Sequence, residues 1–270
     1  HCRSLNPVGC ALTGIAEQAA WGRHFFDFIH HDSRDYVEFA WDINRASSEV
    51  HWIEFRLRGN GYWVSASWVH LPAEVKQPLS GSIIIFVDIT EARHKDQQLH
   101  LQAHYDTLTG LPNRQLLRER LEQDLSRAKR EQQNVALLWI DLDGFKAVND
   151  RLGHAAGDEL LQQAAVRVRN RLRESDTVAR MGSDEFAVLL LAITDPAAAL
   201  RVAEALIARL TEPFMLTAGI GQISASIGVA LYPLHTDAPE VLIQAAETAM
   251  VAAKQAGKHQ AVVWELQLLK

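Results

Sequence analysis

Residues 177–190 read TVARMGSDEFAVLL, and this stretch decides how the second half of the chain folds. Two β-prone runs flank the short segment GSDEF (182–186), and a Gly-containing connection between such runs predicts a β-hairpin. The turn carries two adjacent carboxylates, Asp184 and Glu185, where the strands begin to pair. Crowded carboxylates repel one another unless a cation lies between them, so the hairpin is a candidate metal site.

A second acidic pair follows an apolar strand. Residues 135–140, VALLWI, form the short continuous apolar run that is typical of a buried strand. Asp141 and Asp143 come directly after it, where α/β proteins usually hold ligands. An EF-hand is excluded because Gly144 stands at the fourth place of the loop and not the sixth. Together with the hairpin carboxylates, these aspartates predict a hard-oxygen site for two Mg²⁺ or Mn²⁺ ions.

Helices and strands alternate through the rest of this half, which predicts a mixed α/β domain. Leucines at four-residue spacing mark the apolar face of a first helix, at Leu117, Leu121 and Leu125. Further helices are expected over 158–172, 196–210 and 239–257, and further strands over 222–232 and 261–265.

The first ninety residues have a different pattern. Three strands are expected over 51–57, 61–71 and 81–90, after short helices and loops. This half resembles a PAS sensor domain whose first strand is missing, through NPVGCALTG (6–14), FFDFIHHDSR (25–34), RLRGNGYWVSASW (56–68) and VDIT (87–90). The resemblance implies an antiparallel sensor fold, with flavin, haem or no ligand left open.

Two features of this half, and one of the segment that follows it, have competing interpretations. His30, His31 and Asp32 could bind a metal or haem, but we interpret them as a polar loop. A flavin pocket could be lined by five tryptophans, Trp21, Trp41, Trp52, Trp63 and Trp68, but aromatic residues in strands are usually core. Between the halves, Ile89, Ala92, Asp96, Leu99 and Ala103 recur at steps of three and four residues. That spacing predicts a helix over 91–105, either a coiled coil that pairs two chains or an ordinary linker.

Bulk properties limit the classes of function. The net charge of −6 argues against a nucleic-acid polymer as the partner. Two cysteines are too few for a disulfide framework and favour a reducing compartment. No apolar run reaches the length of a membrane span, although the chain begins with His and is interpreted as part of a longer protein. We expect a cytoplasmic location, with a membrane anchor elsewhere in the full-length protein left open.

Residues 106–270 resemble a GGDEF domain, the catalytic module of diguanylate cyclases. The matching stretches are DTLTGLPNR (106–114), DLDGFKAVNDRLGHAAGDELL (141–161), RMGSDEF (180–186), SIGVA (226–230) and AKQAGK (253–258). The resemblance implies a palm-like α/β fold with a central, mainly antiparallel sheet, similar to nucleotidyl cyclases. It also implies that a homodimer condenses two GTP molecules into cyclic di-GMP and pyrophosphate. The domains expected are therefore PAS over 1–90, a signalling helix over 91–105 and GGDEF over 106–270.

The resemblance assigns roles residue by residue. Asp141 matches the metal-bridging carboxylate, and the Leu142 carbonyl would complete a metal shell. Asp184 and Glu185 would hold metals and help deprotonate the ribose 3′-hydroxyl. Lys146 matches the lysine that offsets charge developing on the phosphate.

The same resemblance assigns the GTP site. Asn149 and Asp158 supply the donors and acceptors that guanine needs. Phe145, Gly182 and Ser183 are implied neighbours of the bound nucleotide.

Two charged pairs complete the candidates. Lys254 and Lys258, expected on one helical face, would hold the terminal phosphates. Arg173 and Asp176 stand at the R-x-x-D spacing of the family's product-inhibition site.

A second hypothesis is a non-catalytic module that binds GTP or cyclic di-GMP. Three departures from the family pattern favour it: Ser183 for glycine, Lys258 for arginine and Val251 for an aromatic residue. If Ser183 needed a positive φ, serine would cost on the order of 1 kcal/mol there. A downstream phosphodiesterase domain in a longer protein is a third hypothesis.

Overall fold

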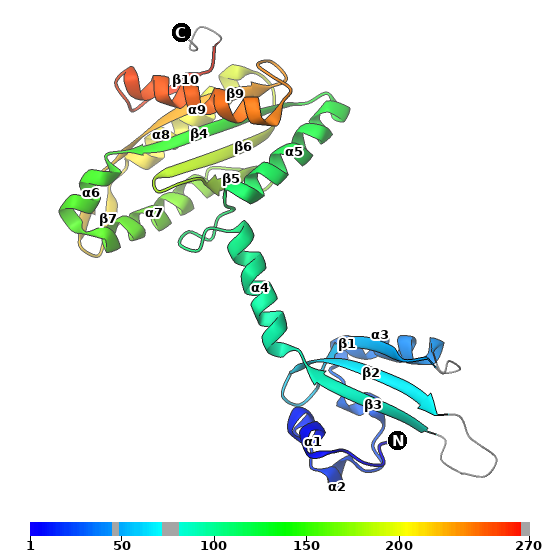
Figure 1. Ribbon diagram of the computed structural model, residues 1–270. Coiled ribbons are helices and arrows are strands. Elements are labelled where there is room, and N and C mark those ends of the chain that lie inside the picture. The colour runs from blue at the N-terminus through cyan, green and yellow to red at the C-terminus, as the bar shows by residue number, and fades with distance from the viewer. Residues whose placement is uncertain (45–48, 72–80, 266–270) are drawn as a thin grey trace, which may run out of the picture. The chain divides into compact units, whose positions relative to one another are not determined.

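The chain divides into two compact units, His1–Leu99 and His100–Lys270 (Figure 1). A computed structural model describes residues 1–44, 49–71 and 81–265. No helix within those ranges combines the length and the apolar character that a membrane span needs.

The N-terminal unit is built on an antiparallel sheet of the three predicted strands. These are, in spatial order, β1 (His51–Arg56), β2 (Trp63–Leu71) and β3 (Gly81–Asp88). Helical segments precede the sheet: α1 (Pro7–Thr13), α2 (Glu17–Ala20), the 3₁₀ helix η1 (Phe25–Phe28) and α3 (His31–Ile43). The last of these has 13 residues and is longer than the short helices predicted.

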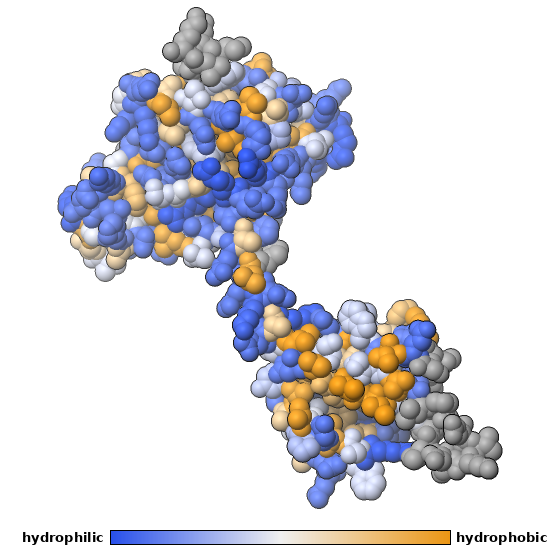
Figure 2. Space-filling view, in the orientation of Figure 1, coloured by the Kyte–Doolittle hydropathy of each residue, from blue (hydrophilic) through white to orange (hydrophobic). Residues whose placement is uncertain are grey.

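The two faces of this sheet differ in burial. One face packs into a core that includes Phe55 and Trp68. On the other face the side chains of Ile83, Ile85 and Val87 are exposed, and Figure 2 shows apolar side chains gathered over this sheet. The tryptophan prediction is therefore right for Trp68 and wrong for Trp21 and Trp52, which are 74% and 73% exposed. Trp52 lies on a side of β1 that no described element covers.

A helix, α4 (Thr90–His104), is present where 91–105 predicted one. Near its start, Arg93 forms an ion pair of 2.6 Å with Glu54. At its end, Asn113 donates its side-chain Nδ2 to the carbonyl of Ala103 and its backbone N–H to the carbonyl of His104, both at 2.8 Å. Each end of α4 is thus hydrogen-bonded to the unit beside it.

The C-terminal unit has a five-stranded sheet in which only β10 runs parallel to its neighbour. Its strands are, in spatial order, β10 (Ala261–Val263), β9 (Ser224–Tyr232), β4 (Asn134–Asp143), β6 (Glu185–Ile193) and β5 (Thr177–Arg180). The helices are α5 (Arg114–Glu131), α6 (Phe145–Leu152), α7 (His154–Arg169), α8 (Pro196–Thr211) and α9 (Pro239–Gln255). A small hairpin joins β7 (Phe214–Leu216) to β8 (Gly219–Gly221).

The central strand β4 is covered on both faces, which explains its unbroken apolar run. Leu138 and Ile140 pack into the core formed with α7 and α8. Leu137 and Trp139 pack into the opposite core, formed with α5 and α9. Because side chains alternate along a strand, Asp141 continues the row of Trp139 and lies on the α9 side of the sheet.

A close approach brings α9 onto the sheet. A Cβ atom at Gly228 of β9 would lie 2.0 Å from the carbonyl oxygen of Ala246, so only glycine fits between them. This contact holds α9, which carries Lys254, against the face that carries Asp141.

Candidate active site

The register of the sheet brings the predicted carboxylates together. Asp141 of β4 lies directly opposite Glu185 of β6, and the backbone N–H of Leu142 donates to the carbonyl of Asp184 at 3.1 Å. The strand β4 continues through Asp143, so Asp141 and Asp143 lie within its last three residues. The prediction had placed both aspartates after the end of the strand. The longer strand is what places Asp141 beside Glu185.

Lys254 reaches this cluster from α9. Its Nζ lies 2.5 Å from Oδ2 of Asp141. Burial raises the pKa of Asp141, Lys254 acts to lower it, and the nearby charges of Asp184 and Asp143 add to the rise. One lysine therefore faces a group of carboxylates whose mutual repulsion it only partly offsets.

The donor set fits a divalent cation. Oδ2 of Asp143 accepts hydrogen bonds from the Ser226 hydroxyl at 2.8 Å and from the backbone N–H of His259 at 3.3 Å. Its other oxygen, Oδ1, is buried and has no hydrogen-bond partner. Carboxylate oxygens grouped in this way are the ligands that Mg²⁺ and Mn²⁺ prefer. The chemistry of these residues thus suits the metals implied by the sequence.

The hairpin turn differs from expectation in its backbone. The φ angle of Ser183 does not lie in the left-handed region, so serine brings no conformational strain to this turn. Its hydroxyl donates to Oδ1 of Asp184 at 2.5 Å. The turn is also held by Arg180, whose Nη2 donates to the carbonyl of Ser183 at 2.9 Å.

Arg180 connects the turn to a loop whose role the sequence did not predict. Its Nη1 lies 3.1 Å from both carboxylate oxygens of Asp106. Asp106 also accepts from the backbone N–H and the hydroxyl of Thr109, at 2.8 and 2.6 Å. Burial acts to raise the pKa of Asp106, but the hydrogen bonds from Thr109 and Arg180 outweigh it and leave the pKa lowered. The D-x-x-T spacing, typical of a side-chain-capped turn, was the available signal.

The predicted guanine-binding residues lie where α6 meets α7. Oδ1 of Asn149 is buried and has no hydrogen-bond partner. A Cβ atom at Gly157 would lie 1.8 Å from that oxygen, so Asn149 packs directly on the glycine. Asp158 is the next residue and is exposed. Gly157 was not among the predicted site residues. Its lack of a side chain leaves room for Oδ1 of Asn149, an acceptor without a partner, beside the Asp158 carboxylate.

The start of α6 presents the next two candidates. Gly144, with a φ of 87°, turns the chain from β4 into α6. Lys146 is exposed in the first helical turn, whereas the side chain of Phe145 is 8% exposed and belongs to the core. Only the backbone of Phe145 is therefore available to contact a nucleotide. Gly182, in the hairpin turn, is exposed.

The prediction that Lys254 and Lys258 share a helical face is wrong. The helix α9 ends at Gln255, and Gly257 follows with a φ of 117°. Lys258 is exposed in the loop before β10 and is itself left-handed, with a φ of 64°. The helical spacing continues in the sequence, but the backbone leaves the helix before the left-handed Gly257.

Arg173 and Asp176 lie in the turn between α7 and β5. The carboxylate of Asp176 accepts from the backbone N–H of Arg173 at 3.0 Å and from that of Leu191 at 3.3 Å. Among the residues that the structure describes, no ion pair joins the two side chains. The exposed guanidinium of Arg173 therefore remains free for another partner.

The fold and the clustered carboxylates define a mixed α/β cyclase domain with a central, mostly antiparallel sheet. The family model described as "Diguanylate cyclase, GGDEF domain" matches residues 103–260. The chain belongs to this family.

Relatives with known names share the same region. The diguanylate cyclase TpbB of Pseudomonas aeruginosa is 48% identical over 168 residues, which are 61% of this chain and 39% of that protein. The probable diguanylate cyclase DgcE of Escherichia coli is 32% identical over 269 residues, 97% of this chain and 24% of that protein. The solved GGDEF domain of TpbB is 46% identical, with a TM-score of 0.60 over 62% of this chain and 97% of that one. The chain thus spans well under half the length of these two named relatives.

Proposed function

We propose that the C-terminal unit is an active diguanylate cyclase that condenses two GTP molecules into cyclic di-GMP and releases pyrophosphate. The observation that carries this proposal is the register of Asp141 opposite Glu185, with Lys254 in contact with Asp141. A cluster of half-buried carboxylates around the buried Asp141 needs cations, and a phosphate-binding lysine beside it suits a nucleoside triphosphate. The relatives' names point to the same reaction.

In this proposal, Asp141, the Leu142 carbonyl, Asp184 and Glu185 hold two Mg²⁺ or Mn²⁺ ions. The bound ions would supply charge neutralisation for the phosphates and lower the pKa of the attacking hydroxyl. Asp184 or Glu185 takes the proton of a ribose 3′-hydroxyl. The 3′-oxygen then bonds to the α-phosphorus of the other GTP, and the bond to pyrophosphate breaks. The same step in the opposite direction closes the ring, so two pyrophosphates leave for each cyclic di-GMP formed.

The remaining residues bind and orient GTP. Asn149 accepts from the guanine edge through its unpaired Oδ1, and Asp158 accepts beside it. Lys146, Lys254 and Lys258 neutralise the phosphates, and Lys146 stabilises the charge that develops as pyrophosphate leaves. Adenine would leave these polar groups unpaired, which gives selectivity for guanine.

Pairing of two chains follows from the reaction, because one domain holds one GTP. We propose a homodimer formed through α4 and the N-terminal unit, which we interpret as a PAS sensor domain acting in the cytoplasm. The exposed apolar residues of β3 and the exposed Leu99 and Leu101 of α4 support this proposal. A signal at the sensor would change how α4 presents the catalytic domains.

Product inhibition is proposed at Arg173 and Asp176. The free guanidinium of Arg173 suits a phosphate or a purine face. The Asp176 carboxylate already caps its own turn, so it would contribute only its remaining acceptor capacity.

A non-catalytic binding module is the second candidate. It is favoured by Lys258, which lies off the helix and offers a single ammonium where arginine would offer a fork. Incubation of the chain with GTP and Mg²⁺, followed by chromatography for cyclic di-GMP, separates the two. Product that disappears in Asp184→Asn supports the cyclase; intact GTP binding without product supports the module.

A further inference from the structure

The loop between α9 and β10, residues 256–260, carries the proposed phosphate ligand Lys258. Its first part caps the helix. The backbone N–H of Gly257 donates to the carbonyl of Lys254 at 3.3 Å, and the N–H of Lys258 donates to the carbonyl of Ala253 at 3.0 Å. These two hydrogen bonds are the Schellman pattern, which ends a helix at a left-handed glycine. The cap sets where the loop leaves α9.

Two further residues of this loop have a left-handed backbone. Lys258 has a φ of 64° and His259 has a φ of 50°, and neither is glycine. A left-handed conformation is sterically unfavourable for a residue with a side chain, so it persists only where surrounding contacts impose it. Such residues gather at active sites and at ligand clamps. The contacts that hold His259 therefore also set the direction in which its neighbour Lys258 leaves the backbone.

Those contacts come from the end of β4 and the start of β9, which are neighbouring strands (Figure 1). The backbone N–H of His259 donates to Oδ2 of Asp143 at 3.3 Å, and the Ser226 hydroxyl donates to the same oxygen at 2.8 Å. The Ser224 hydroxyl and Nδ1 of the His259 ring lie 2.5 Å apart. In the sheet, Ser224 lies directly opposite Asp143. His259 is thus tied to both strands at one end of the sheet.

We propose that Asp143 and His259 are positioning residues that direct Lys258 toward the terminal phosphates of GTP. This inference rests on the proposed function and adds two residues to it. Lys254 contacts Asp141 through its side chain, and Lys258 is tied to Asp143 through the backbone of His259. Because Asp141 and Asp143 belong to one strand, that strand sets the spacing between both phosphate ligands and the metal ligands.

The geometry separates this role of Asp143 from metal binding. Both hydrogen bonds go to Oδ2, while Oδ1 is buried and has no partner. Asparagine at this position would keep an acceptor for the His259 N–H but lose the negative charge, and alanine would lose both. In the part of the chain that the structure describes, no ion pair joins Asp143 to Lys258. A direct contact therefore does not account for coupling between these two side chains.

The test is a double-mutant cycle on the whole chain, with Asp143→Ala and Lys258→Met made singly and together. The KM for GTP is measured from initial rates with Mg²⁺. Binding without turnover is measured by titration calorimetry with a GTP analogue in which a methylene group replaces the oxygen between the α- and β-phosphorus atoms. Hydrogen exchange over residues 257–260, without nucleotide, reports the state of the loop itself.

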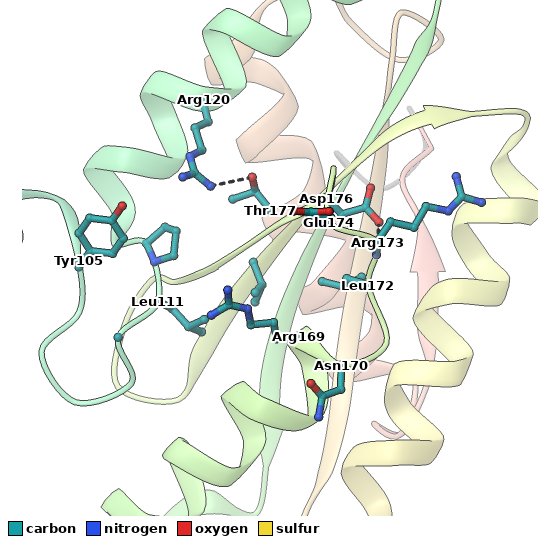
Figure 3. A pocket seen from close by; sticks show the side chains of 13 residues that line it. Tyr105, Leu111, Arg120, Arg169, Asn170, Leu172, Arg173, Glu174, Asp176 and Thr177 are labelled. Atoms are coloured by element: carbon teal, nitrogen blue, oxygen red, sulfur yellow. Dashed lines mark hydrogen bonds between the residues drawn. The ribbon is translucent and has the colours of Figure 1, made fainter.

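Three further variants and controls complete the design. Asp143→Asn keeps the acceptor, and His259→Ala removes the contact with Ser224. Gln255→Ala is the matched control for His259→Ala, because it also replaces an exposed polar side chain near the end of α9. Asn170→Ala is a control from another part of the domain, where its side chain lines a separate cavity (Figure 3). Both controls should keep the affinity of the unmodified chain for the analogue.

Asp143→Ala should raise the KM for GTP and the Kd for the analogue about tenfold, because Lys258 is no longer held on the phosphates. The kcat should change much less, since this contact binds substrate and transition state alike. Asp143→Ala should add little to Lys258→Met, because both remove the same contact. Asp143→Asn should recover most of the affinity, and His259→Ala should lose part of it. Exchange over 257–260 should be faster in Asp143→Ala than in the unmodified chain.

Unchanged affinity for the analogue in Asp143→Ala would overturn the inference and leave the cyclase proposal intact, whether or not exchange over 257–260 becomes faster. Fully additive effects of Asp143→Ala and Lys258→Met would also overturn it. An Asp143→Asn variant as weak as Asp143→Ala would show that the charge matters and the acceptor does not, which overturns the positioning role. No binding of the analogue by the unmodified chain would overturn the proposed function, and this inference with it.

Discussion

The ammonium of Lys254 lies 2.5 Å from Oδ2 of Asp141, so a proposed phosphate ligand contacts a proposed metal ligand. The lysine comes from α9 and the aspartate from β4, and the close packing at Gly228 holds the two elements together. In the nucleotide-free protein the lysine acts as a counter-charge for a buried carboxylate. When GTP and metal bind, the phosphates would become the partner of Lys254 and the metal would become the partner of Asp141.

Replacing Lys254 should therefore separate metal binding from nucleotide binding. Lys254→Met removes the cation that competes with metal for Asp141, so Mn²⁺ should bind more tightly in the absence of nucleotide. The same variant should raise the KM for GTP by about tenfold, because a phosphate contact is lost. Mn²⁺ affinity is measured by titration calorimetry, with Lys258→Met as the control that leaves Asp141 untouched. Weaker Mn²⁺ binding in Lys254→Met would contradict this account.

Gly157→Ala should weaken GTP binding without unfolding the domain. The new methyl group would lie where Oδ1 of Asn149 now lies, at 1.8 Å, so the amide must move out of its position. We expect the KM for GTP to rise about tenfold, the loss that follows from a misplaced hydrogen bond. A double-mutant cycle provides the control: adding Asn149→Ala should cause little further change. Fully additive effects would show that Gly157 acts elsewhere.

Ser183→Gly should leave cyclase activity equal or higher. The serine has no positive φ, so glycine relieves no strain and lowers stability by up to about 1 kcal/mol through backbone entropy. Its hydroxyl donates to Oδ1 of Asp184, and removing it frees that oxygen. Ser183→Ala, which lacks the hydroxyl without the flexibility, should match glycine in activity and exceed it in melting temperature. A marked loss of activity in both variants would assign the hydroxyl a necessary role.

Asp106→Asn should destabilise the catalytic domain in a pH-dependent way. The pKa of Asp106 is lowered in the folded protein, so its contribution is fully present above the ordinary value of 3.8 and is lost as pH falls below it. At neutral pH the loss of the paired hydrogen bonds with Arg180 should cost about 1–3 kcal/mol. Urea unfolding between neutral and acidic pH measures the difference, which should shrink as the wild-type carboxyl protonates.

Asp124→Asn provides a control, because the pKa of Asp124 is shifted in the opposite direction to that of Asp106. Burial raises the pKa of Asp124, with Arg127 and Arg120 acting against the rise. The charged form is therefore disfavoured in the folded state at neutral pH. Asp124→Asn should leave stability equal or higher at neutral pH, and a large destabilisation there would contradict the assigned cause.

Much of the catalytic domain could be predicted because its strongest patterns are local. The apolar run of β4 indicated a strand buried on both faces, and the Gly-containing GSDEF turn indicated the hairpin of β5 and β6. The short strands β7 and β8 have three residues each and show no periodicity. The helix α6 was missed because it has only eight residues, although its apolar residues Phe145, Val148 and Leu152 follow helical spacing.

The site was harder to predict because it depends on contacts between distant segments. Which residue lies opposite Asp141 is set by the strand register, and the sequence gives no measure of it. The contact of Gly157 with Asn149 joins two helices, and that of Asp106 with Arg180 spans 74 residues. Lys258 was misplaced because helical spacing continues through a glycine whose backbone ends the helix.

The central claim is that paired copies of this chain join two GTP molecules. The most direct measurement is the initial rate of cyclic di-GMP formation per chain, with GTP and Mg²⁺, over a range of protein concentrations. We predict a rate per chain that rises with concentration and then levels as dimers form, and that is abolished in Asp184→Asn. Undetectable cyclic di-GMP at every concentration, with GTP still bound, would contradict the account and assign the chain to the binding modules.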